Sequence, residues 1–510
     1  MKHRSDQPHH SSAPKQAGSP RLHRRALLKG MGLTALGSMA GLGIGCALPR
    51  IRREVSEGEL LINPTEVSAD NGLLNVTIKA QYGQYRLAGK DVMLRCYDGK
   101  PIGNTLRVKT GDTLRLTLEN HLPYDPLQEL CTAVPTVEDN TPKGFNVTNM
   151  HVHGVHVSPE SPSDNILLLV GYKQTEHYRY EIPSDHPPGT YFYHAHFHGS
   201  VALQVASGMA GALIIEGPLD EIPEIKAAKE QVLCFQTPRV NKTGVCENYT
   251  VLDQPGDTLI NGQLKPVIRM SPGEVQRWRL VNASHMDNML FGIQDQGFTA
   301  LCFDGNPLDY SKIMDTAVLI PGNRADILVK AGAEPRRQAI YRDISQEDSE
   351  DNIIAWLEVT ADTAKDMPLY SGALPRPDGL DDIEPEEVTF GRRLEFGMSG
   401  DPKGRKYTVN GQPFSCLDAW QIPLNAVEEW EVYNHTSESH PFHIHVNPFQ
   451  MISGGDVEPG TWLDTVNLKP FERIRFRTRF QDFTGTFVFH CHNLTHEDLG
   501  MMQAVNVYKP

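Results

Sequence analysis

His490-Cys491-His492 opens a short run near the end of the chain that continues with His496 and Met501. The side chains of a strand alternate between its two faces, so Cys491 would point one way and both flanking histidines the other. A thiolate, an imidazole and a thioether at this spacing are the parts of a blue copper site. The run therefore predicts two metal centres, one on each face of a strand, with electron transfer from one copper to others.

Short alternating runs of apolar and polar residues fill most of the remaining chain. Examples are residues 74–80, 113–118, 275–280 and 473–477, and Gly, Pro, Asn and Asp separate such runs. Period-two patterning with frequent turns is typical of β-sandwiches and barrels. We therefore expect an all-β protein.

A weak internal repeat indicates several similar units. Residues 104–112, 264–274 and 421–428 each place an extended run, a turn and an acidic residue before a strand that ends in Asn. Repeats at domain spacing indicate similar modules. The expected organisation is a leader at 1–47, domains at 60–220, 225–362 and 389–510, and a Pro- and acid-rich linker or loop at 363–388.

The charge is unevenly distributed along the chain. The formal net charge is −15, and residues 1–46 carry seven Lys or Arg and one acidic residue, so the rest stands at −21. The strongly negative charge of the residues after 46 argues against binding to nucleic acid or to an anionic membrane. We expect a monomer whose partners are small molecules.

The N-terminus has the pattern of an export leader. Arg24-Arg25 precedes leucines, a lysine and a Gly- and Ala-rich apolar run, which resembles a twin-arginine signal. Residues 43–46 resemble a lipoprotein processing site, with Gly43 where leucine is usual, so Cys46 would carry a lipid anchor. Cleavage after Ala47 is the alternative. We expect export to the periplasm or cell surface, with anchoring left open.

Eight cysteines are present. If Cys46 belongs to the leader and Cys491 binds metal, six remain, and in an oxidising compartment they form either disulfides or buried free thiols. The six are Cys96, Cys131, Cys234, Cys246, Cys302 and Cys416.

Histidines cluster in four places along the chain. On a strand, His-x-His places both imidazoles on one face, where they can bind one metal or two adjacent ones. Imidazole with a single thiolate favours copper over structural zinc, which usually takes several cysteines. The clusters are His151-Val152-His153, His194-Ala195-His196, His440 with His443-Ile444-His445, and His490-Cys491-His492 with His496.

These clusters, with Trp462-Leu463-Asp464-Thr465-Val466, resemble the multicopper oxidases, a laccase-like family of three cupredoxin domains. The resemblance covers about residues 65–510, and every ligand position of the family is filled. It implies three Greek-key β-sandwich domains and four coppers per chain. A copper-dependent oxidoreductase that uses dioxygen as acceptor is therefore expected.

The resemblance also implies a role for each ligand. Met501, as a weak axial ligand, would give the type 1 copper a low-to-middle reduction potential. The implied ligands are His440, Cys491, His496 and Met501 for type 1 copper, His151 and His443 for type 2, and His153, His194, His196, His445, His490 and His492 for the type 3 pair.

Dioxygen reduction needs protons as well as electrons. Glu497, beside His496, matches a family acid with a proton-relay role, and Asp164 lies where the family places a second acid. Both are candidate catalytic residues, and ordinary surface charge is the alternative reading of each.

The electron donor is the open part of the prediction. The donor is expected to be a phenol, an aromatic amine or a metal ion; we expect laccase-type oxidation of phenols, with oxidation of Cu(I), Fe(II) or Mn(II) as the alternative. The methionines are scattered, and residues 363–388 contain only Met367, which argues against a dedicated cuprous oxidase. Two other classes, a silent envelope scaffold and a copper-binding protein without turnover, are disfavoured by the complete ligand set and by the shared Cys491.

Overall fold

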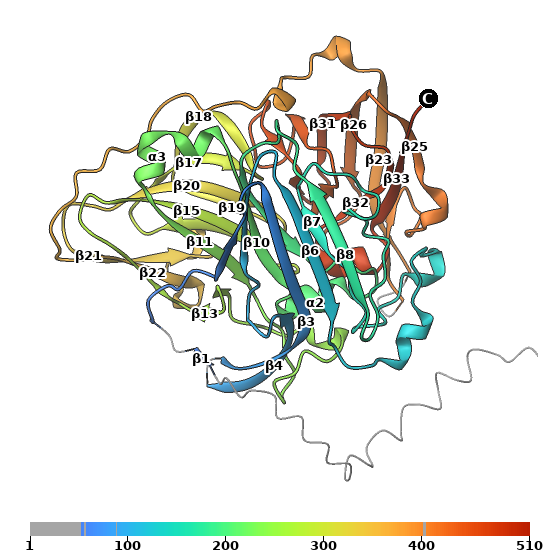
Figure 1. Cartoon of the computed structure of the whole chain (residues 1–510), viewed down its shortest axis with the longest axis horizontal. Helices are drawn as coiled ribbons and strands as arrows, with labels where there is room; N and C mark the ends of the chain where they lie inside the picture. Colours follow the sequence, from blue (N-terminus) through green and yellow to red (C-terminus); the bar gives the residue numbers. More distant parts are fainter. Residues whose placement is uncertain (1–52, 56–57, 88, 401–403) are drawn as a thin grey trace, which may run out of the picture. The chain divides into compact units, whose positions relative to one another are not determined.

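A computed structural model describes residues 53–55, 58–87, 89–400 and 404–510. The predicted leader and Cys46 lie outside these residues. Within them, strands pair into six sheets, two for each of three successive stretches of chain (Figure 1). We refer to these stretches as module 1 (residues 53–216), module 2 (229–359) and module 3 (390–508). The all-β prediction is confirmed.

Module 1 contains two five-stranded sheets. In the first, β4 pairs only with β3, and the others follow the order β1-β3-β6-β8. The strands are β1 (Arg53–Val55), β3 (Leu73–Leu87), β4 (Lys90–Tyr97), β6 (Thr113–Asn120) and β8 (Thr175–Glu181), and in the second sheet β2 (Glu66–Ser68), β5 (Thr105–Lys109), β10 (Ala210–Glu216), β9 (Gly189–His194) and β7 (His151–His153).

Module 2 pairs a seven-stranded sheet with a five-stranded one. In sheet order, the first contains β13 (Gln263–Leu264), β12 (Leu259–Ile260), β11 (Lys229–Gln236), β15 (Val275–Asn282), β20 (Arg324–Lys330), β17 (Phe298–Phe303) and β18 (Asn306–Met314). The second contains β14 (Val267–Met270), β22 (Ile353–Val359), β21 (Arg336–Tyr341), β16 (Met289–Ile293) and β19 (Thr316–Leu319).

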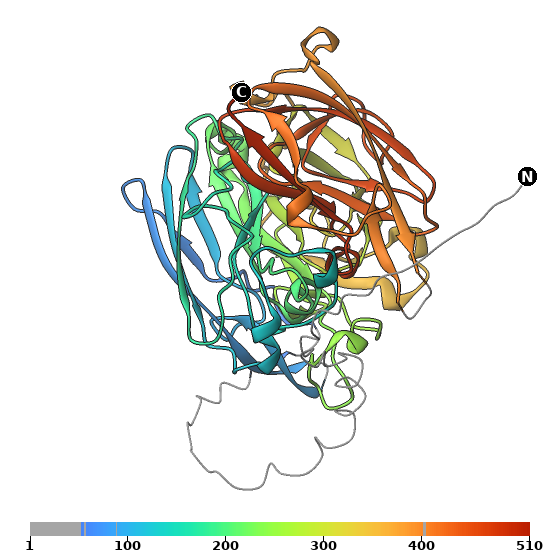
Figure 2. The ribbon, with the colours of Figure 1, turned by 90° about the vertical axis from the view of Figure 1, so that its right-hand side faces the viewer.

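Module 3 pairs a six-stranded sheet with a five-stranded one, drawn in orange and red in Figure 2. The first contains β24 (Lys406–Val409), β23 (Phe390–Ser399), β26 (Ala426–Asn434), β31 (Arg473–Phe480), β28 (Phe449–Ser453) and β29 (Trp462–Leu463). The second contains β25 (Trp420–Pro423), β33 (Met502–Tyr508), β32 (Gly485–Cys491), β27 (His440–Ile444) and β30 (Thr465–Leu468).

Helices are short and connect the strands. Among the described residues, no helix is long and apolar enough to cross a membrane. The α-helices are α2 (Val201–Ser207), α3 (Pro223–Ala227) and α4 (Leu494–Asp498). The 3-10 helices are η1 (Pro126–Leu130), η2 (Val137–Asp139), η3 (Pro218–Glu221), η4 (Tyr249–Val251), η5 (Ile344–Gln346), η6 (Glu350–Asn352), η7 (Asp378–Leu380), η8 (Pro385–Glu387) and η9 (Cys416–Asp418).

The weak repeat in the sequence corresponds to a repeated piece of structure. Its copies form β5, β14 and β25, and each leads into a strand of the opposite sheet, β6, β15 or β26. Each of these strands ends in a fully buried Asn, namely Asn120, Asn282 and Asn434. All three side-chain amides donate to two or more backbone carbonyls of neighbouring loops and strand ends. The repeat therefore encodes, in every module, a strand end whose Asn side chain holds neighbouring backbone segments by hydrogen bonds.

Each module encloses its own apolar core, and module 1 also shares one with module 2. Trp278 and Trp430 are fully buried in the cores of modules 2 and 3. Phe192 and Ile214 of module 1 pack with Val232 and Val281 of module 2 in the shared cluster. Burial of apolar area of this kind is the main stabilising contribution to such a contact.

The seven described cysteines are all free. Cys96, Cys234, Cys246 and Cys302 are buried, which fits the interpretation of apolar core residues. The alternative of disulfides among the six cysteines is not borne out by this structure.

Candidate metal centre

Two neighbouring strands of module 3 carry candidate ligands on both faces. β27 and β32 pair antiparallel, with His443 opposite His490 and Phe442 opposite Cys491. Because strand side chains alternate, residues an odd number apart face opposite ways. One face therefore holds His440 and Cys491, and the other holds His443, His445, His490 and His492.

The first face carries a compact site of one thiol and two imidazoles. His440 Nδ1 lies 3.0 Å from His496 Nδ1, and Cys491 Sγ lies 3.5 Å and 3.7 Å from these two nitrogens. The Met501 side chain is fully buried in the same core cluster, and its backbone carbonyl accepts from the Cys491 N–H at 3.0 Å. Three predicted type 1 ligands, His440, Cys491 and His496, are thus brought together by β27, β32 and α4, while the role of Met501 as axial ligand stays a prediction.

Helix α4 connects the two faces. It begins three residues after Cys491 and contains His496 and Glu497 at successive positions, which a helix turns about 100° apart. His496 consequently faces Cys491, whereas Glu497 Oε2 lies 3.1 Å from His490 Nδ1 and Oε1 lies 3.5 Å from His196 Nδ1. One helical turn therefore serves both sites.

The second face meets the histidines of module 1. β7 pairs with β9 so that His151 lies opposite His194. The ring of His151 stacks on that of His445 with centroids 4.0 Å apart, and the ring of His153 stacks on that of His443 at 3.8 Å. All eight histidines predicted for the trinuclear site are gathered here and are at most 2% exposed.

Six of the eight histidines form two groups of three. In one group, His490 Nε2 lies 3.3 Å from His196 Nε2 and 3.2 Å from His445 Nε2. In the other group, ring centroids are 4.8 to 5.7 Å apart among His153, His194 and His492. Neutral imidazole nitrogens aimed at one another without an acceptor between them are the arrangement expected around a metal ion.

Hydrogen bonds on the outer side of the rings determine which nitrogen faces inward. His151 Nδ1 contacts Asp164 Oδ2 at 2.8 Å, and His194 Nδ1 contacts the Ala195 carbonyl at 2.9 Å, so Nε2 of each ring is left without a partner. For His153 the arrangement is reversed, since its Nε2 contacts Asp464 Oδ1 at 3.2 Å and Nδ1 has no partner. A fixed outer bond sets the tautomer of a metal-binding histidine.

The site also favours the neutral imidazole, which is the form that binds metal. Burial lowers the pKa of His194, His196 and His440 to about 3. For His151, burial and then the positive charge that neighbouring imidazoles would carry hold the pKa well below its ordinary value. These histidines are therefore unprotonated at neutral pH.

The donor set fits copper. Buried ring nitrogens without partners, tautomers fixed from outside and low pKa values all suit metal ligands. Imidazole alone is compatible with several metals, but one thiolate with two imidazoles, as at His440, Cys491 and His496, is typical of copper. The fold and site therefore define a copper protein with type 1, type 2 and type 3 centres. The assignment of single histidines to type 2 or type 3 stays a prediction.

Both predicted acids lie at the trinuclear site. Asp164 accepts from the Val152 N–H at 3.0 Å as well as contacting His151, and burial raises its pKa to about 8. Glu497 is fully buried, and burial raises its pKa to about 7 despite the attraction of His196. Neither carboxyl is an ordinary surface charge, although their proton-relay roles stay predictions.

Three histidines close in sequence to the ligand motifs lie outside the metal site. His198 is buried and contacts Asn140 Oδ1 through Nε2 at 3.1 Å. His156 contacts Asp482 Oδ2 at 3.0 Å, and the side chain of His435, about half exposed, contacts Glu395 at 3.0 Å. Each of these three imidazoles thus has a hydrogen-bond or ion-pair partner of its own, separate from the predicted copper ligands.

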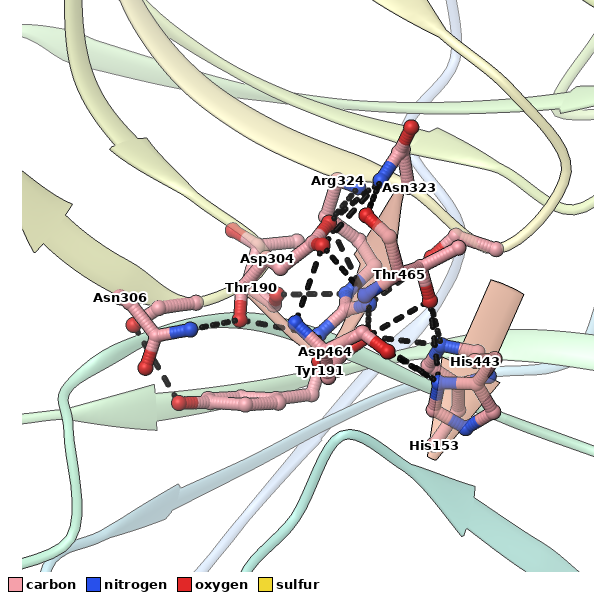
Figure 3. Close-up of polar contacts among 12 residues, drawn as sticks. His153, Thr190, Tyr191, Asp304, Asn306, Asn323, Arg324, His443, Asp464 and Thr465 are labelled. Carbon is pink, nitrogen blue, oxygen red and sulfur yellow. Dashed lines mark hydrogen bonds and ion pairs between the residues drawn. The ribbon is translucent and has the colours of Figure 1, made fainter. Parts of the chain in front are cut away.

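Sequence reasoning missed two groups of residues around the metal site. Asp464, quoted only as part of a family-like stretch, contacts His153 and is bound by Arg324 (Figure 3). Glu438 and Tyr407 surround His496 at the type 1 site. The strand motif at residues 462–466 was the only available signal for Asp464, and none pointed to the others.

Three family models, each described as multicopper oxidase, match residues 139–220, 235–359 and 387–510. They cover parts of all three modules and every predicted ligand. The chain belongs to the multicopper oxidase family. It is therefore a copper oxidoreductase that uses dioxygen as acceptor together with a reducing substrate.

Named relatives and solved structures agree with this assignment. Multicopper oxidase mco of Staphylococcus aureus is 26% identical over 463 residues, covering 86% of this chain and 90% of that protein. A multicopper oxidase from Campylobacter jejuni, described as a metallo-oxidase, superposes with a TM-score of 0.71 at 24% identity, covering 89% of this chain and 96% of that one. A laccase from Pediococcus acidilactici gives 0.72 at 22% identity, covering 90% and 96%. The two structures establish the likeness of fold.

Proposed function

We propose that this enzyme oxidises phenolic compounds by one electron each and delivers the electrons to dioxygen, which is reduced to water. Copper, when bound, supplies the one-electron acceptance and the dioxygen reduction. The chain's own contribution to the choice of donor lies at His496, because this ligand contacts a partly exposed carboxylate.

The observation that carries the proposal is the carboxylate beside His496. Glu438 Oε2 lies 3.3 Å from His496 Nε2, and the Glu438 side chain is 34% exposed. Tyr407 stacks on His496 with ring centroids 3.9 Å apart and donates its hydroxyl to Glu438 at 2.9 Å. An aromatic wall, an exposed acceptor and the edge of a metal-ligand ring thus meet at one point.

This arrangement suits a phenol. Removing one electron from ArOH gives a phenoxyl radical and a proton. A proton acceptor beside the point where the electron enters the protein therefore assists the step. Glu438 can accept the phenolic hydrogen bond and then the proton, which passes to solvent. The electron passes from the phenol to the type 1 site by way of His496. Four phenols and one dioxygen give four phenoxyl radicals and two waters, which balances electrons and protons.

Dioxygen uptake by the copper-loaded protein tests the proposal. We expect turnover with phenols, and the variant Glu438→Gln should lower kcat/KM for phenols by about 100-fold, the usual contribution of a proton acceptor. The pH dependence of kcat/KM should change with it. Glu395→Gln is the matched control, because Glu395 pairs with His435 on the same module, away from the copper ligands.

Uptake with Cu(I), Fe(II) or Mn(II) and none with phenols would overturn the phenolic assignment. Metal-ion oxidation is the second candidate, because an exposed carboxylate beside the electron entry also suits Mn(II). The Arg405 guanidinium lies 3.0 Å from Glu438 Oε1 and disfavours a cation there, which is why the phenol is preferred.

We further propose that the protein is exported and works outside the cytoplasm as a monomer. The arginine pair at residues 24–25 and the acidic remainder of the chain support this location. Mass spectrometry of the mature N-terminus decides between a lipidated Cys46 and a free Leu48. An unprocessed N-terminus in exporting cells would contradict the proposal.

A further inference from the structure

Module 2 supplies no predicted copper ligand, yet one of its side chains reaches the trinuclear site. Arg324, the first residue of β20, is fully buried. Its Nη1 donates to Asp464 Oδ1 at 2.9 Å and its Nη2 to Asp464 Oδ2 at 2.5 Å. This is the two-pronged geometry in which a guanidinium holds a carboxylate both by charge and by orientation.

Asp464 passes this orientation to two ligands from different modules. Its Oδ1 lies 3.2 Å from His153 Nε2 of module 1, and His443 Nδ1 of module 3 lies 2.9 Å from the Asp464 backbone carbonyl and 3.4 Å from Oδ1 (Figure 3). The Thr465 hydroxyl lies 3.2 Å and 3.0 Å from the same two ring nitrogens. With these nitrogens engaged, His153 Nδ1 and His443 Nε2 are left without partners. Asp464, together with the neighbouring Thr465 hydroxyl, therefore leaves Nδ1 of His153 and Nε2 of His443 as the nitrogens that would bind a metal.

Arg324 has little freedom to move from this position. Besides Asp464, it donates to the backbone carbonyls of Thr190, Asp304 and Gly322 at 3.2, 3.0 and 2.8 Å. These bonds occupy all five N–H donors of the guanidinium. An arginine without a spare donor holds its carboxylate in one place.

The Asp304 carboxylate joins the same cluster to β30. It accepts from the Arg324 N–H at 3.0 Å and from the Thr465 N–H at 3.1 Å. Asn323 donates to both oxygens of Asp304 and to the Thr465 carbonyl. The segments that carry Arg324 and Asp464 are thus tied by their backbones as well as by their side chains.

Two glycines allow this close approach. A Cβ at Gly154 would lie 2.3 Å from both Arg324 Nη2 and Asp464 Oδ2. A Cβ at Gly322 would lie 3.0 Å from His153 Cε1 and 3.2 Å from the His492 ring. Both glycines have positive φ, at 80° and 92°, which L side chains rarely adopt. Module 2 therefore packs against the ligand rings themselves.

We propose that Arg324 is a positioning residue for the trinuclear copper site: it orients Asp464, which in turn orients His153 and His443. Docking of module 2 then completes a site whose ligands all come from modules 1 and 3. The proposal rests on copper binding by the histidines described above and is independent of which electron donor is used.

The variant Arg324→Lys tests this, because lysine keeps the charge but loses the fork. We expect the trinuclear coppers to be released to a chelator at about 10- to 100-fold lower concentration, the usual effect of losing a partner of a metal-binding histidine. The type 1 site, which Arg324 does not touch, should keep its blue absorption. The blue absorption reports the type 1 site. Copper content per chain and the type 2 electron paramagnetic resonance signal report the trinuclear site.

Arg277→Lys is the matched control. Arg277 is a buried arginine of the same module that pairs with Asp220 at 2.6 Å and Asp326 at 2.5 Å and makes no described contact with a ligand. We expect this variant to retain trinuclear copper like the unmodified protein. If both variants lose copper equally, or if Arg324→Lys loses none, the proposal is overturned.

A second variant covers the case in which Arg324→Lys does not fold. Asp464→Asn keeps the side-chain volume and removes the charge that the fork holds, and it should show the same selective loss of trinuclear copper. If both variants fold, the double variant should lose no more than the larger single loss, since Arg324 acts through Asp464. Full copper retention by Asp464→Asn, or additive losses in the double variant, would refute the mechanism. Failure to oxidise phenols with copper intact would refute only the proposed function.

Discussion

Asp164 was predicted as a proton-relay acid, but its contacts predict a measurable effect on copper binding as well. Its Oδ2 contacts His151 Nδ1 at 2.8 Å and its Oδ1 accepts from the Val152 N–H at 3.0 Å, while the residue is 3% exposed. Asp164→Asn leaves the volume unchanged and replaces one acceptor oxygen by an NH₂ group. The amide can accept from either partner but not from both, and it carries no charge.

The expected size of the effect follows from these two bonds. Losing the carboxylate partner of a metal-binding histidine typically weakens metal binding by about 10- to 100-fold, which is about 1.4 to 2.7 kcal/mol. Because His151 faces the metal through Nε2 only while Nδ1 is held, the loss should fall on the type 2 copper. The type 1 absorption should be unaffected.

Chelator titration followed by copper analysis and the type 2 resonance signal measures this effect directly. Asp482→Asn is the control, because Asp482 contacts His156 at 3.0 Å outside the metal site. A variant at position 164 that binds copper as tightly as the control, yet reduces dioxygen slowly, would refute positioning and leave proton transfer as the sole role of Asp164.

Three further outcomes are expected. Cys491→Ser should abolish the blue absorption and turnover while the histidine cluster still retains copper, so copper analysis should show about one ion fewer per chain; loss of all copper would contradict separate sites. Glu497→Gln should slow dioxygen reduction by about 100-fold and alter its pH profile, because it removes an acid beside His490 and His196, while anaerobic bleaching of the blue absorption by substrate continues unchanged; an unchanged rate of reduction would exclude the relay. In the copper-free protein, burial works against the charge of Glu230, but Arg279 and Arg107 lower its pKa to about 2 from an ordinary 4.5. This carboxylate therefore stabilises the fold above about pH 4.5, and up to about 3 kcal/mol of that stabilisation is lost as the pH falls toward 2. Urea titrations should show this loss in the unmodified protein and a flatter profile in Glu230→Gln.

The parts of the fold and site that local sequence encodes could be predicted. Strand alternation places Cys491 on one face and its neighbours His490 and His492 on the other. The odd spacing between His440 and His443 likewise places these two residues of β27 on different faces. The repeated Asn at a strand end indicated similar modules for a comparable reason, because its hydrogen bonds go to loops of the same module. Such signals depend on a few neighbouring residues, so they can be recognised in the sequence without knowledge of the tertiary structure.

Contacts between modules left no such signal. Arg324 and Asp464 are 140 positions apart, and Asp464 and His153 are 311 apart. Nothing in the composition around Asp304 or Arg324 distinguishes them from the ion pairs of any β-sandwich. The state of the six cysteines was open for the same reason, since whether they pair or stay free depends on which thiols the fold brings together, and here all six are free.

The sequence also leaves open which ring nitrogen of each histidine would bind the metal. Spacing motifs identify His153 and His151 as equivalent members of one His-x-His pair, yet the nitrogen left without a partner, which would bind the metal, is Nδ1 in the first and Nε2 in the second. The choice is made by Asp464 and the neighbouring Thr465 hydroxyl for one ring and by Asp164 for the other. Since Asp464 is itself held by Arg324, the atom that His153 presents is determined by a module that contributes no predicted ligand. The motif therefore specifies which residues bind copper, while the docking of module 2 specifies how one of them does so.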